Sequence, residues 1–272
     1  MGEGFDTVVA NQNITLLGNI EQLIVQGAAT AATGSGDGEI IYGLNSTNGL
    51  SLNGAGGADT IYGSNQSDSL TGGGGNDIML GFGGTNSFAG GAGDDQYYTS
   101  SATDTLSENG GEGNDIVIAS YNHTLSANFE QLILLPGGTV GIGNTDANVL
   151  NGSIAGAGVT LSGLGGIDSI FGSGFADTLS GGVGNDTLLG DAGNDTFLYN
   201  AAGLGIDTIS DFAGGAGVGD VIDVDGVFAD FAAVQAAASQ VGANTEITID
   251  ASNKIILANF TAANLDANDF LF

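Results

Sequence analysis

The sequence predicts an all-β fold, a solenoid in which short strands stack along one axis. Three observations support this prediction: a nine-residue motif recurs in tandem, a unit of 109 residues occurs twice, and the composition changes after Asp225. Because a repeat protein grows along one axis and needs no large central core, the length of 272 residues does not by itself set the number of domains.

The nine-residue motif has a glycine-rich half and an acidic half. Its clearest copies begin at Gly72, Gly90 and Gly181 and follow the pattern G-G-x-G-x-D-x-U-x, in which U is apolar. Glycines allow tight turns that expose backbone carbonyls, and the aspartate at position six supplies an anionic oxygen. Such hard oxygen ligands favour calcium, so the motif predicts a metal site and a fold together.

Tandem copies of the motif begin at residues 54, 63, 72, 81 and 90, and a second array begins at 163, 172, 181 and 190. Every copy carries an apolar or aromatic residue at its eighth position: Ile61, Leu70, Met79, Phe88, Tyr97, Ile170, Leu179, Leu188 and Phe197. We expect this ladder to form the core. The copies at 63 and 81 are degenerate, and Asn86 replaces the aspartate of the latter, which predicts a weaker metal site there.

A longer repeat encloses the arrays. Residues 2–24 match residues 111–133, and the same offset carries Asp59 to Asp168 and Asp77 to Asp186. We therefore predict a first unit over residues 1–109 and a second over 110–225, with short β-type runs outside the motif as further turns of the solenoid. Met1 stands where Gly110 stands in the second unit, so we expect the sequence to begin inside a repeat of a longer protein.

Residues 226–272 are predicted to form a small α+β cap. Residues 228–240 are rich in alanine and place apolar side chains at helical spacing, which predicts one amphipathic helix. Two β-type runs at 245–250 and 254–258 flank Ala251-Ser252-Asn253, which predicts a hairpin.

The charge of the chain restricts its partners. The sequence has 31 acidic residues and a single basic one, Lys254, which gives a formal net charge of −30. Nucleic acids and anionic membranes are therefore unfavourable partners. Each pair of like charges about 4 Å apart costs on the order of 1 kcal/mol even in water, so stacked aspartates need cations between them. The chain has no cysteine for a thiolate site, and no apolar run approaches the roughly 20 residues of a membrane span.

The sequence offers no catalytic constellation. His123 is the only histidine, no G-x-S-x-G motif is present, and Glu21 and Glu130 recur at the 109-residue offset as expected for a structural position. We therefore expect the chain itself to be non-catalytic. Four further aspartates are interpreted as turn or solvated residues: Asp94, Asp104, Asp146 and Asp191.

With these motifs the chain resembles the RTX (repeats-in-toxin) family of secreted bacterial proteins. The nonapeptides carry the resemblance, together with residues 205–212 and 219–224, which look like the region where such arrays meet a C-terminal cap. The ending Asp269-Phe270-Leu271-Phe272 is similar to the acidic-aromatic ending of type I secretion substrates. The resemblance implies a right-handed parallel β-roll in which two nonapeptides make one turn and several Ca²⁺ ions lie between copies n and n+2.

The resemblance also implies which residues hold the ions. The ligands would be backbone carbonyls of the glycine-rich half and the sixth-position aspartates. The positions in this sequence are Gly57, Asp59, Gly72, Gly73, Gly74, Gly75, Asp77, Gly90, Asp95 and Asp115 in the first unit, and Gly166, Asp168, Asp177, Gly181, Gly182, Gly184, Asp186, Gly190 and Asp195 in the second. Asp177 departs from the pattern in one respect, since Phe175 replaces the fourth-position glycine of its copy.

The resemblance finally implies a function. The chain would be a calcium-binding, calcium-folded region of a larger secreted adhesin, surface-layer protein or exoprotein, in the extracellular medium or at the bacterial cell surface. The alternative is the C-terminal calcium and secretion module of an RTX enzyme or toxin whose catalytic domain lies upstream. Expected partners are calcium and the type I secretion machinery, with cell-surface polysaccharide or self-association left open.

Overall fold

The computed structural model describes residues 4–200, 203–215 and 219–272. Met1, Gly2 and Glu3, which the repeat comparison used, lie outside these ranges. The predicted all-β fold is confirmed as a parallel β-solenoid, and the described residues contain one α-helix. The chain divides into two compact units: unit 1 runs up to Ser120 and includes Ser126–Gln131, and unit 2 comprises Tyr121–Leu125 and Leu132–Phe272. The duplication boundary at residues 109/110 stays a prediction from the repeat.

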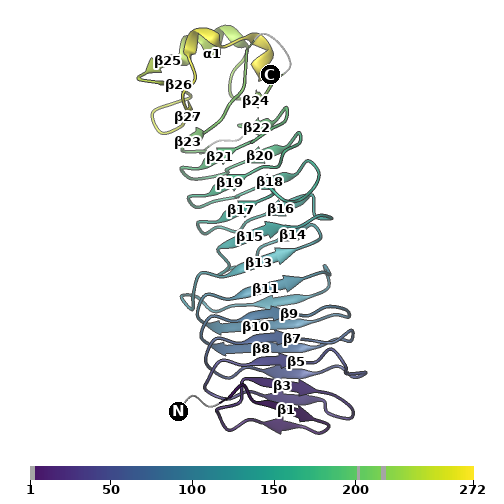
Figure 1. Cartoon of the computed structure of the whole chain (residues 1–272). Coiled ribbons are helices and arrows are strands. Elements are labelled where there is room, and N and C mark those ends of the chain that lie inside the picture. Colours follow the sequence, from purple (N-terminus) through teal and green to yellow (C-terminus); the bar gives the residue numbers. More distant parts are fainter. Residues whose placement is uncertain (1–3, 201–202, 216–218) are drawn as a thin grey trace. The chain divides into compact units, whose positions relative to one another are not determined.

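Unit 1 consists of two parallel sheets whose strands alternate along the chain (Figure 1). The first has the order β1 (Thr7–Ala10), β3 (Gln22–Val25), β5 (Ile40–Tyr42), β7 (Thr60–Tyr62), β9 (Ile78–Leu80), β11 (Gln96–Thr99), β13 (Ile116–Ala119). The second has the order β12 (Thr105–Ser107), β10 (Ser87–Ala92), β8 (Ser69–Gly74), β6 (Ser51–Asn53), β4 (Ala31–Thr33), β2 (Ile14–Thr15). Each turn of the solenoid therefore adds one strand to each sheet.

Unit 2 has the same construction. One sheet has the order β14 (His123–Thr124), β16 (Val140–Ile142), β18 (Thr160–Ser162), β20 (Thr178–Ser180), β22 (Thr196–Leu198), β24 (Val221–Asp223), β28 (Phe270–Leu271). The other contains β17 (Val149–Asn151), β19 (Ser169–Phe171), β21 (Thr187–Leu189), β23 (Ile206–Ile209), β27 (Lys254–Leu257), β26 (Asn244–Thr248), β25 (Ala238–Val241). β15 (Gln131–Leu134) begins in unit 1 with Gln131 and continues into unit 2.

The register of the sheets follows the motif. Thr60 lies opposite Ile78 in unit 1, and Thr178 lies opposite Thr196 in unit 2, so partners within the arrays are 18 residues apart. Two nonapeptides thus make one turn, as predicted. The same motif position recurs directly above itself, which aligns the apolar, glycine and aspartate positions in separate columns.

The eighth-position ladder forms the core. All nine of its side chains are at most 1% exposed, because successive positions point inward from alternating sheets. Full burial of such a side chain contributes roughly 1.5–3 kcal/mol relative to its exposure to water. The predicted core is confirmed, and the solenoid has a continuous apolar interior despite its glycine content.

Glycine is required where neighbouring turns approach closely. Gly75 has a φ of +115°, and a Cβ built on it would lie 2.2 Å from the carbonyl oxygen of Gly57 in the preceding turn. No L-residue fits at that distance, and the positive φ adds strain to any replacement.

The helix predicted within residues 228–240 is present but shorter than predicted. α1 spans Phe231–Ala237, and the Asp230 carboxylate caps it by accepting from the backbone N–H of Ala233 (2.9 Å). The helix ends before residue 240 because β25 pairs antiparallel with β26, which in turn forms the predicted hairpin with β27. Two short 3₁₀ helices, Ala262–Asn264 and Ala267–Asp269, lead into β28.

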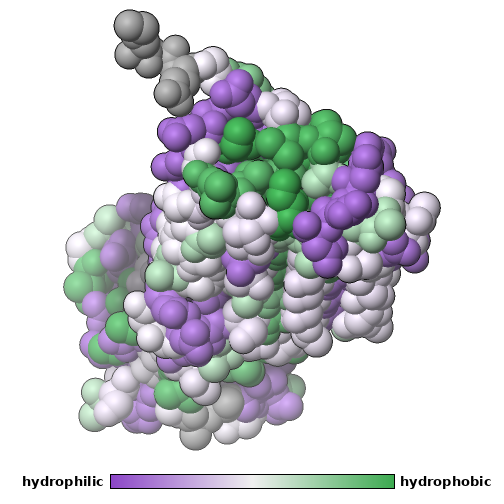
Figure 2. Space-filling model, turned by 90° about the horizontal axis from the view of Figure 1, so that it is seen from below, coloured by the Kyte–Doolittle hydropathy of each residue, from purple (hydrophilic) through white to green (hydrophobic). Residues whose placement is uncertain are grey.

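The N-terminal end of unit 1 presents hydrophobic side chains. β1 lies at the end of its sheet, and Phe5, Val9 and Leu17 are exposed on this first turn, Leu17 at 96%. Figure 2 looks onto this end and shows hydrophobic surface gathered there. Single exposed apolar residues are common on proteins, but a continuous apolar area beside an edge strand favours pairing with other chains. Within the described ranges, no helix is long and apolar enough to cross a membrane.

The buried ladder generates a stability prediction. We expect Leu70→Ala to lower the free energy of unfolding of the calcium-loaded chain by about 2–5 kcal/mol, because Leu70 is fully buried and its truncation leaves a cavity. Chemical denaturation at fixed calcium concentration measures the loss. The neighbouring exposed Ser69→Ala is the control, and equal losses in the two variants would contradict the inward position of Leu70.

Candidate metal centre

The sixth-position aspartates of unit 1 form a buried column. The backbone N–H of Asp59 donates to Oδ1 of Asp77 (2.8 Å), that of Asp77 donates to Oδ1 of Asp95 (2.7 Å), and that of Asp95 donates to Oδ1 of Asp115 (2.9 Å). All four residues are at most 1% exposed. Each carboxylate is therefore held by the backbone of the preceding turn.

A second column of unit 1 passes through the degenerate copies. Asp68 donates its backbone N–H to Oδ1 of Asn86 (2.9 Å), and Asn86 donates its own to Oδ1 of Asp104 (2.8 Å). The amide of Asn86 thus keeps the hydrogen bond of an aspartate while removing its charge. Asp104, interpreted above as a turn or solvated residue, instead ends this column and also accepts from the Thr99 hydroxyl (2.6 Å).

Unit 2 repeats both columns. In one, the backbone N–H of Asp168 donates to Asp186 (2.8 Å), and that of Asp186 donates to Asp207 (2.9 Å). In the other, Asp177 donates to Asp195 (2.9 Å) and Asp195 donates to Asp220 (3.0 Å). Asp207 and Asp220 were not among the predicted site residues, since both lie beyond the last nonapeptide. Their only sequence signal is an aspartate that follows glycine closely and precedes a β-type run.

The copies of the motif differ in whether the second carboxylate oxygen, Oδ2, has a hydrogen-bond partner. Among the residues that the structure describes, six buried Oδ2 atoms have no hydrogen-bond partner, those of Asp59, Asp77, Asp95, Asp168, Asp186 and Asp195. In the copies at 63 and 172 a serine occupies the second position, and the backbone N–H groups of Ser64 and Ser173 donate to Oδ2 of Asp68 and Asp177. These two copies thus supply a protein donor where the copies at 54, 72, 90, 163, 181 and 190 leave a buried anionic oxygen.

The free oxygens of Asp59, Asp77 and Asp168 each lie near a glycine carbonyl from the next turn. A Cβ built on Gly54 would lie 2.1 Å from Asp59 Oδ2 and 2.6 Å from the carbonyl oxygen of Gly72. On Gly163 it would lie 1.9 Å from Asp168 Oδ2 and 2.5 Å from the carbonyl oxygen of Gly181. The first-position glycine therefore leaves open a cradle of hard oxygen atoms. This donor set fits calcium, which takes carboxylate and carbonyl oxygens in flexible geometry.

The other predicted glycines lie in the turns beside the columns. Gly57, Gly73, Gly75, Gly166, Gly182 and Gly184 all have positive φ and press against the backbone of the preceding turn. Gly74 has open space around it, whereas Gly72, Gly90, Gly181 and Gly190 each lie against the carboxylate of their own copy. The structure thus brings the predicted residues together along each array, and it adds Gly54 and Gly163 to the cradles.

Burial controls the protonation of the columns. It raises the pKa of Asp77 to about 6 and the pKa values of Asp95 and Asp168 to about 7, and hydrogen bonds from the backbone offset this only in part. Neighbouring carboxylates raise the pKa of Asp95 and Asp168 further. In the absence of a cation, these groups therefore keep their protons up to a higher pH than exposed aspartates do.

The remaining candidate positions are structural. Glu21 Oε2 accepts from the backbone N–H of Asp6 (2.7 Å), and Glu130 Oε2 accepts from that of Asp115 (2.7 Å), in agreement with a structural position. His123 is half-buried, its Nδ1 lies 3.1 Å from the Tyr121 hydroxyl, and burial lowers its pKa.

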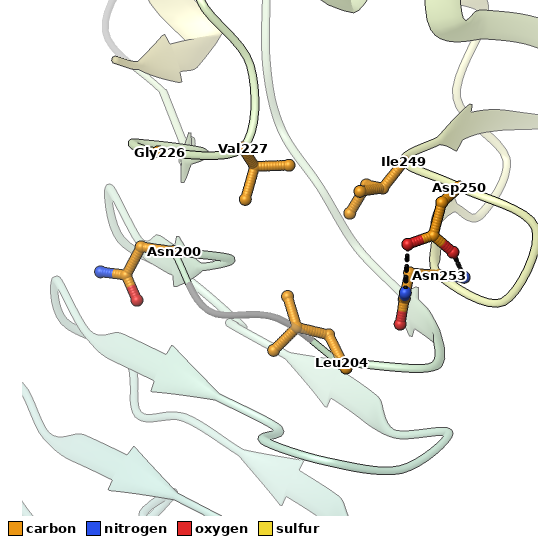
Figure 3. A pocket seen from close by; sticks show the side chains of 8 residues that line it. Asn200, Leu204, Gly226, Val227, Ile249, Asp250 and Asn253 are labelled. Carbon is orange, nitrogen blue, oxygen red and sulfur yellow. Dashed lines mark hydrogen bonds between the residues drawn. The ribbon is translucent and has the colours of Figure 1, made fainter.

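A pocket in unit 2 lies beside the cap (Figure 3). Its lining residues are Asn200, Gly203, Leu204, Gly226, Val227, Ile249, Asp250 and Asn253. Asp250 is the one ionisable residue among them, and Asn253 donates to it from its side chain (2.6 Å). The described lining residues therefore offer a single exposed carboxylate.

Comparison with known proteins adds a family match. A family model of the RTX calcium-binding nonapeptide repeat matches in four copies, over residues 53–88, 81–106 and 162–197. No curated protein gives a match. Among solved structures, the crystal structure of the extracellular lipase LipA from Serratia marcescens is similar, with a TM-score of 0.38 and 17% identity over 87% of this chain. The chain spans 45% of that lipase chain, and at this TM-score the likeness says nothing about activity.

The raised pKa values predict that, without calcium, the stability of the fold decreases as the pH rises. Because an unfolded aspartate titrates near 3.9 and Asp95 and Asp168 titrate at about 7 in the fold, the metal-free folded state binds more protons between these values. This contribution to stability is complete below about pH 4 and is lost as the pH rises through about 7. Denaturation of the full chain in calcium-free buffer at pH 5 and pH 8 measures it. Greater stability at pH 8 would contradict the burial of these carboxyls.

Proposed function

We propose, from the premise that this chain carries RTX calcium-binding repeats in both units, that it is a calcium-binding β-roll that folds when calcium enters its aspartate columns. One observation carries the proposal: among the described residues, six buried aspartate oxygens lack a hydrogen-bond partner, and glycine carbonyls lie beside those of Asp59, Asp77 and Asp168. A buried carboxylate oxygen without a donor is costly unless a cation pairs with it.

The unpaired oxygens indicate which of the predicted residues bind calcium. In unit 1 we assign Asp59, Asp77 and Asp95 as carboxylate ligands, with the carbonyls of Gly72 and Gly90. In unit 2 we assign Asp168, Asp186 and Asp195, with the carbonyl of Gly181. Positive φ angles in the turns beside these ligands are taken by Gly57, Gly73, Gly75, Gly166, Gly182 and Gly184.

Asp177 is assigned a weaker role than the other predicted aspartates. Its Oδ2 accepts from Ser173 N–H, and the Ser173 hydroxyl donates to its Oδ1 (2.8 Å). Asp68 makes the equivalent contacts with Ser64. These copies stabilise their turns with hydrogen bonds, which do not depend on an ion.

Calcium supplies positive charge between carboxylates that otherwise repel. The protein supplies the remaining contacts. Backbone N–H groups bind one oxygen of each aspartate, and the first-position glycines leave space beside the other oxygen. The eighth-position side chains fill the interior. Because the net charge is −30, repulsion between like charges opposes folding of the calcium-free chain at neutral pH. Binding free energy thereby becomes folding free energy.

The parent protein and its location follow as further proposals. We place the chain, which is non-catalytic in itself, in the extracellular medium or at the bacterial cell surface, as a region of a larger secreted adhesin, surface-layer protein or exoprotein. The alternative is that the chain is the calcium and secretion module of an enzyme or toxin. The residues that would distinguish the two parent proteins lie outside this sequence. Self-association is a further proposal from the sequence. A polysaccharide partner stays a proposal of the sequence alone.

Calcium titration of the full chain tests the proposed function. We expect little β-structure at neutral pH without calcium, and a cooperative gain at about 10⁻⁴–10⁻³ M calcium, the range of extracellular modules. Magnesium at the same concentration has a much smaller effect, because it resists losing its water shell. Circular dichroism follows the transition. A β-rich spectrum that is unchanged by a chelator would refute calcium-coupled folding.

A matched pair of variants locates the ions within this titration. Asp77→Asn removes one charge from the middle of the unit 1 column and is expected to lower the number of bound calcium ions measured by calorimetry. Asp94→Asn makes the same chemical change at an exposed neighbour that accepts a hydrogen bond from Asn114 (2.9 Å). Equal ion counts in the two variants would mean that the column does not bind calcium.

Export through a type I channel is proposed from the chain's ending. In the fold Phe270 is buried and β28 pairs with β24, so this part of the ending is accessible only before folding. We expect the double substitution Leu271→Ser, Phe272→Ser to reduce secretion by a host with a matching exporter. Both side chains are about half exposed, so calcium binding is retained. Val241→Ser is the control, and equal secretion of both variants would argue against this role.

A further inference from the structure

The unit 1 column ends at a glutamate where the motif calls for glycine. The first positions of successive turns are Gly54, Gly72 and Gly90, and the register of β10 with β12 places Glu108 next in this series. Glu108 is only 9% exposed, although it belongs to no nonapeptide. Its side chain has turned inward, toward the turn that precedes it.

The Glu108 carboxylate occupies the place that a carbonyl takes elsewhere in the array. A Cβ built on Gly54 or Gly72 would lie 2.6 or 2.7 Å from the carbonyl oxygen of the next first-position glycine. On Gly90 it would instead lie 2.4 Å from Glu108 Oε1, beside Asp95 Oδ2 at 2.1 Å. Gly90 N–H also donates to Glu108 Oε1 (3.1 Å). The last cradle of the array is thus closed by a side chain.

A third carboxylate completes the group. One oxygen each from Asp95, Glu108 and Asp115 lies within 4.8 Å of the other two, and among the described residues this is the one such group of three. Calcium binds oxygen at about 2.3–2.6 Å, so two ligands of one ion are at most about 5 Å apart. The separation of the three oxygens therefore fits a single calcium ion.

Two of these side chains present oxygens that the protein leaves unpaired. Asp95 Oδ2 and Glu108 Oε2 are buried without a hydrogen-bond partner, and Asp95 is 0% exposed. Exposed acidic clusters satisfy their oxygens with water, which is excluded here. The pairing of a closed cradle with free anionic oxygens distinguishes this group from an ordinary acidic surface.

We propose that Asp95, Glu108 and Asp115 form a terminal calcium site of unit 1, built from three side-chain carboxylates. The inference rests on the proposed function, since the other cradles of the array must also bind calcium. Three negative charges exceed the charge available where a glycine carbonyl stands in place of Glu108. Ligand charge is one determinant of calcium affinity, so this site fills before the others in unit 1.

Terbium luminescence of the full chain tests which site fills first. The Tyr97 hydroxyl accepts from Gly90 N–H (2.6 Å), which places this ring beside the proposed site and able to sensitise a bound lanthanide. We expect the first equivalent of Tb³⁺ to emit on tyrosine excitation, and Tyr97→Phe to reduce that emission severalfold. Tyr42→Phe, in β5 and three strands away in the sheet order, is the control and leaves it unchanged. Undiminished emission from Tyr97→Phe would overturn the proposal.

Calcium calorimetry on Glu108→Gln measures the contribution of the third carboxylate. We expect the loss of one ion, or a drop of at least tenfold in the affinity of the tightest class, while the other ions remain. Glu112→Gln, the same change at a half-buried neighbour bonded to Asn109, is the matched control. Unchanged count and affinity in Glu108→Gln would overturn this site and leave the proposed function intact. A wild-type chain that binds no calcium overturns both, and the terbium measurement decides if Glu108→Gln does not fold.

Discussion

The stacked aspartate is the interaction on which the rest of this structure depends. One oxygen of each buried carboxylate accepts a backbone N–H from the preceding turn, and in the complete copies the other oxygen has no protein donor. The first contact fixes the register between turns. The oxygen without a donor makes the fold depend on cations or protons, because buried carboxylates in a column repel one another unless they are neutralised. Register and cation dependence therefore arise from the same side chain.

The degenerate copies show how the solenoid keeps its geometry without an ion. Ser64 and Ser173 each stand at the second position and satisfy Asp68 and Asp177 with backbone and hydroxyl donors. Asn86 keeps the column's hydrogen bond and removes a charge. These replacements reduce the number of unpaired anionic oxygens along one column of each unit, while the eighth-position ladder continues unbroken. Packing and ion binding are thus separable within one motif.

The ends of the columns use residues that the motif does not contain. In unit 1, Glu130 accepts from Asp115 and Glu108 closes the cradle of Gly90, since a longer side chain reaches back where the next turn offers no glycine carbonyl. In unit 2, Asp207 and Asp220 continue the columns across turns of irregular length, and the paired strands of the cap cover the final turns. An array of identical repeats needs such exceptions wherever it stops.

The sequence by itself determined the repeating part of this protein: the parallel solenoid, the two-nonapeptide turn, the ladder from Ile61 to Phe197 and the grouping of glycines with Asp59, Asp77 and their equivalents. Periodicity suffices for this, because each motif position recurs directly above itself. The tertiary structure decided which aspartates keep a free oxygen, where α1 gives way to β25, and that Asp104, Asp207, Asp220 and Glu108 join the columns. These features depend on contacts across turns of unequal length, which no fixed spacing in the sequence encodes.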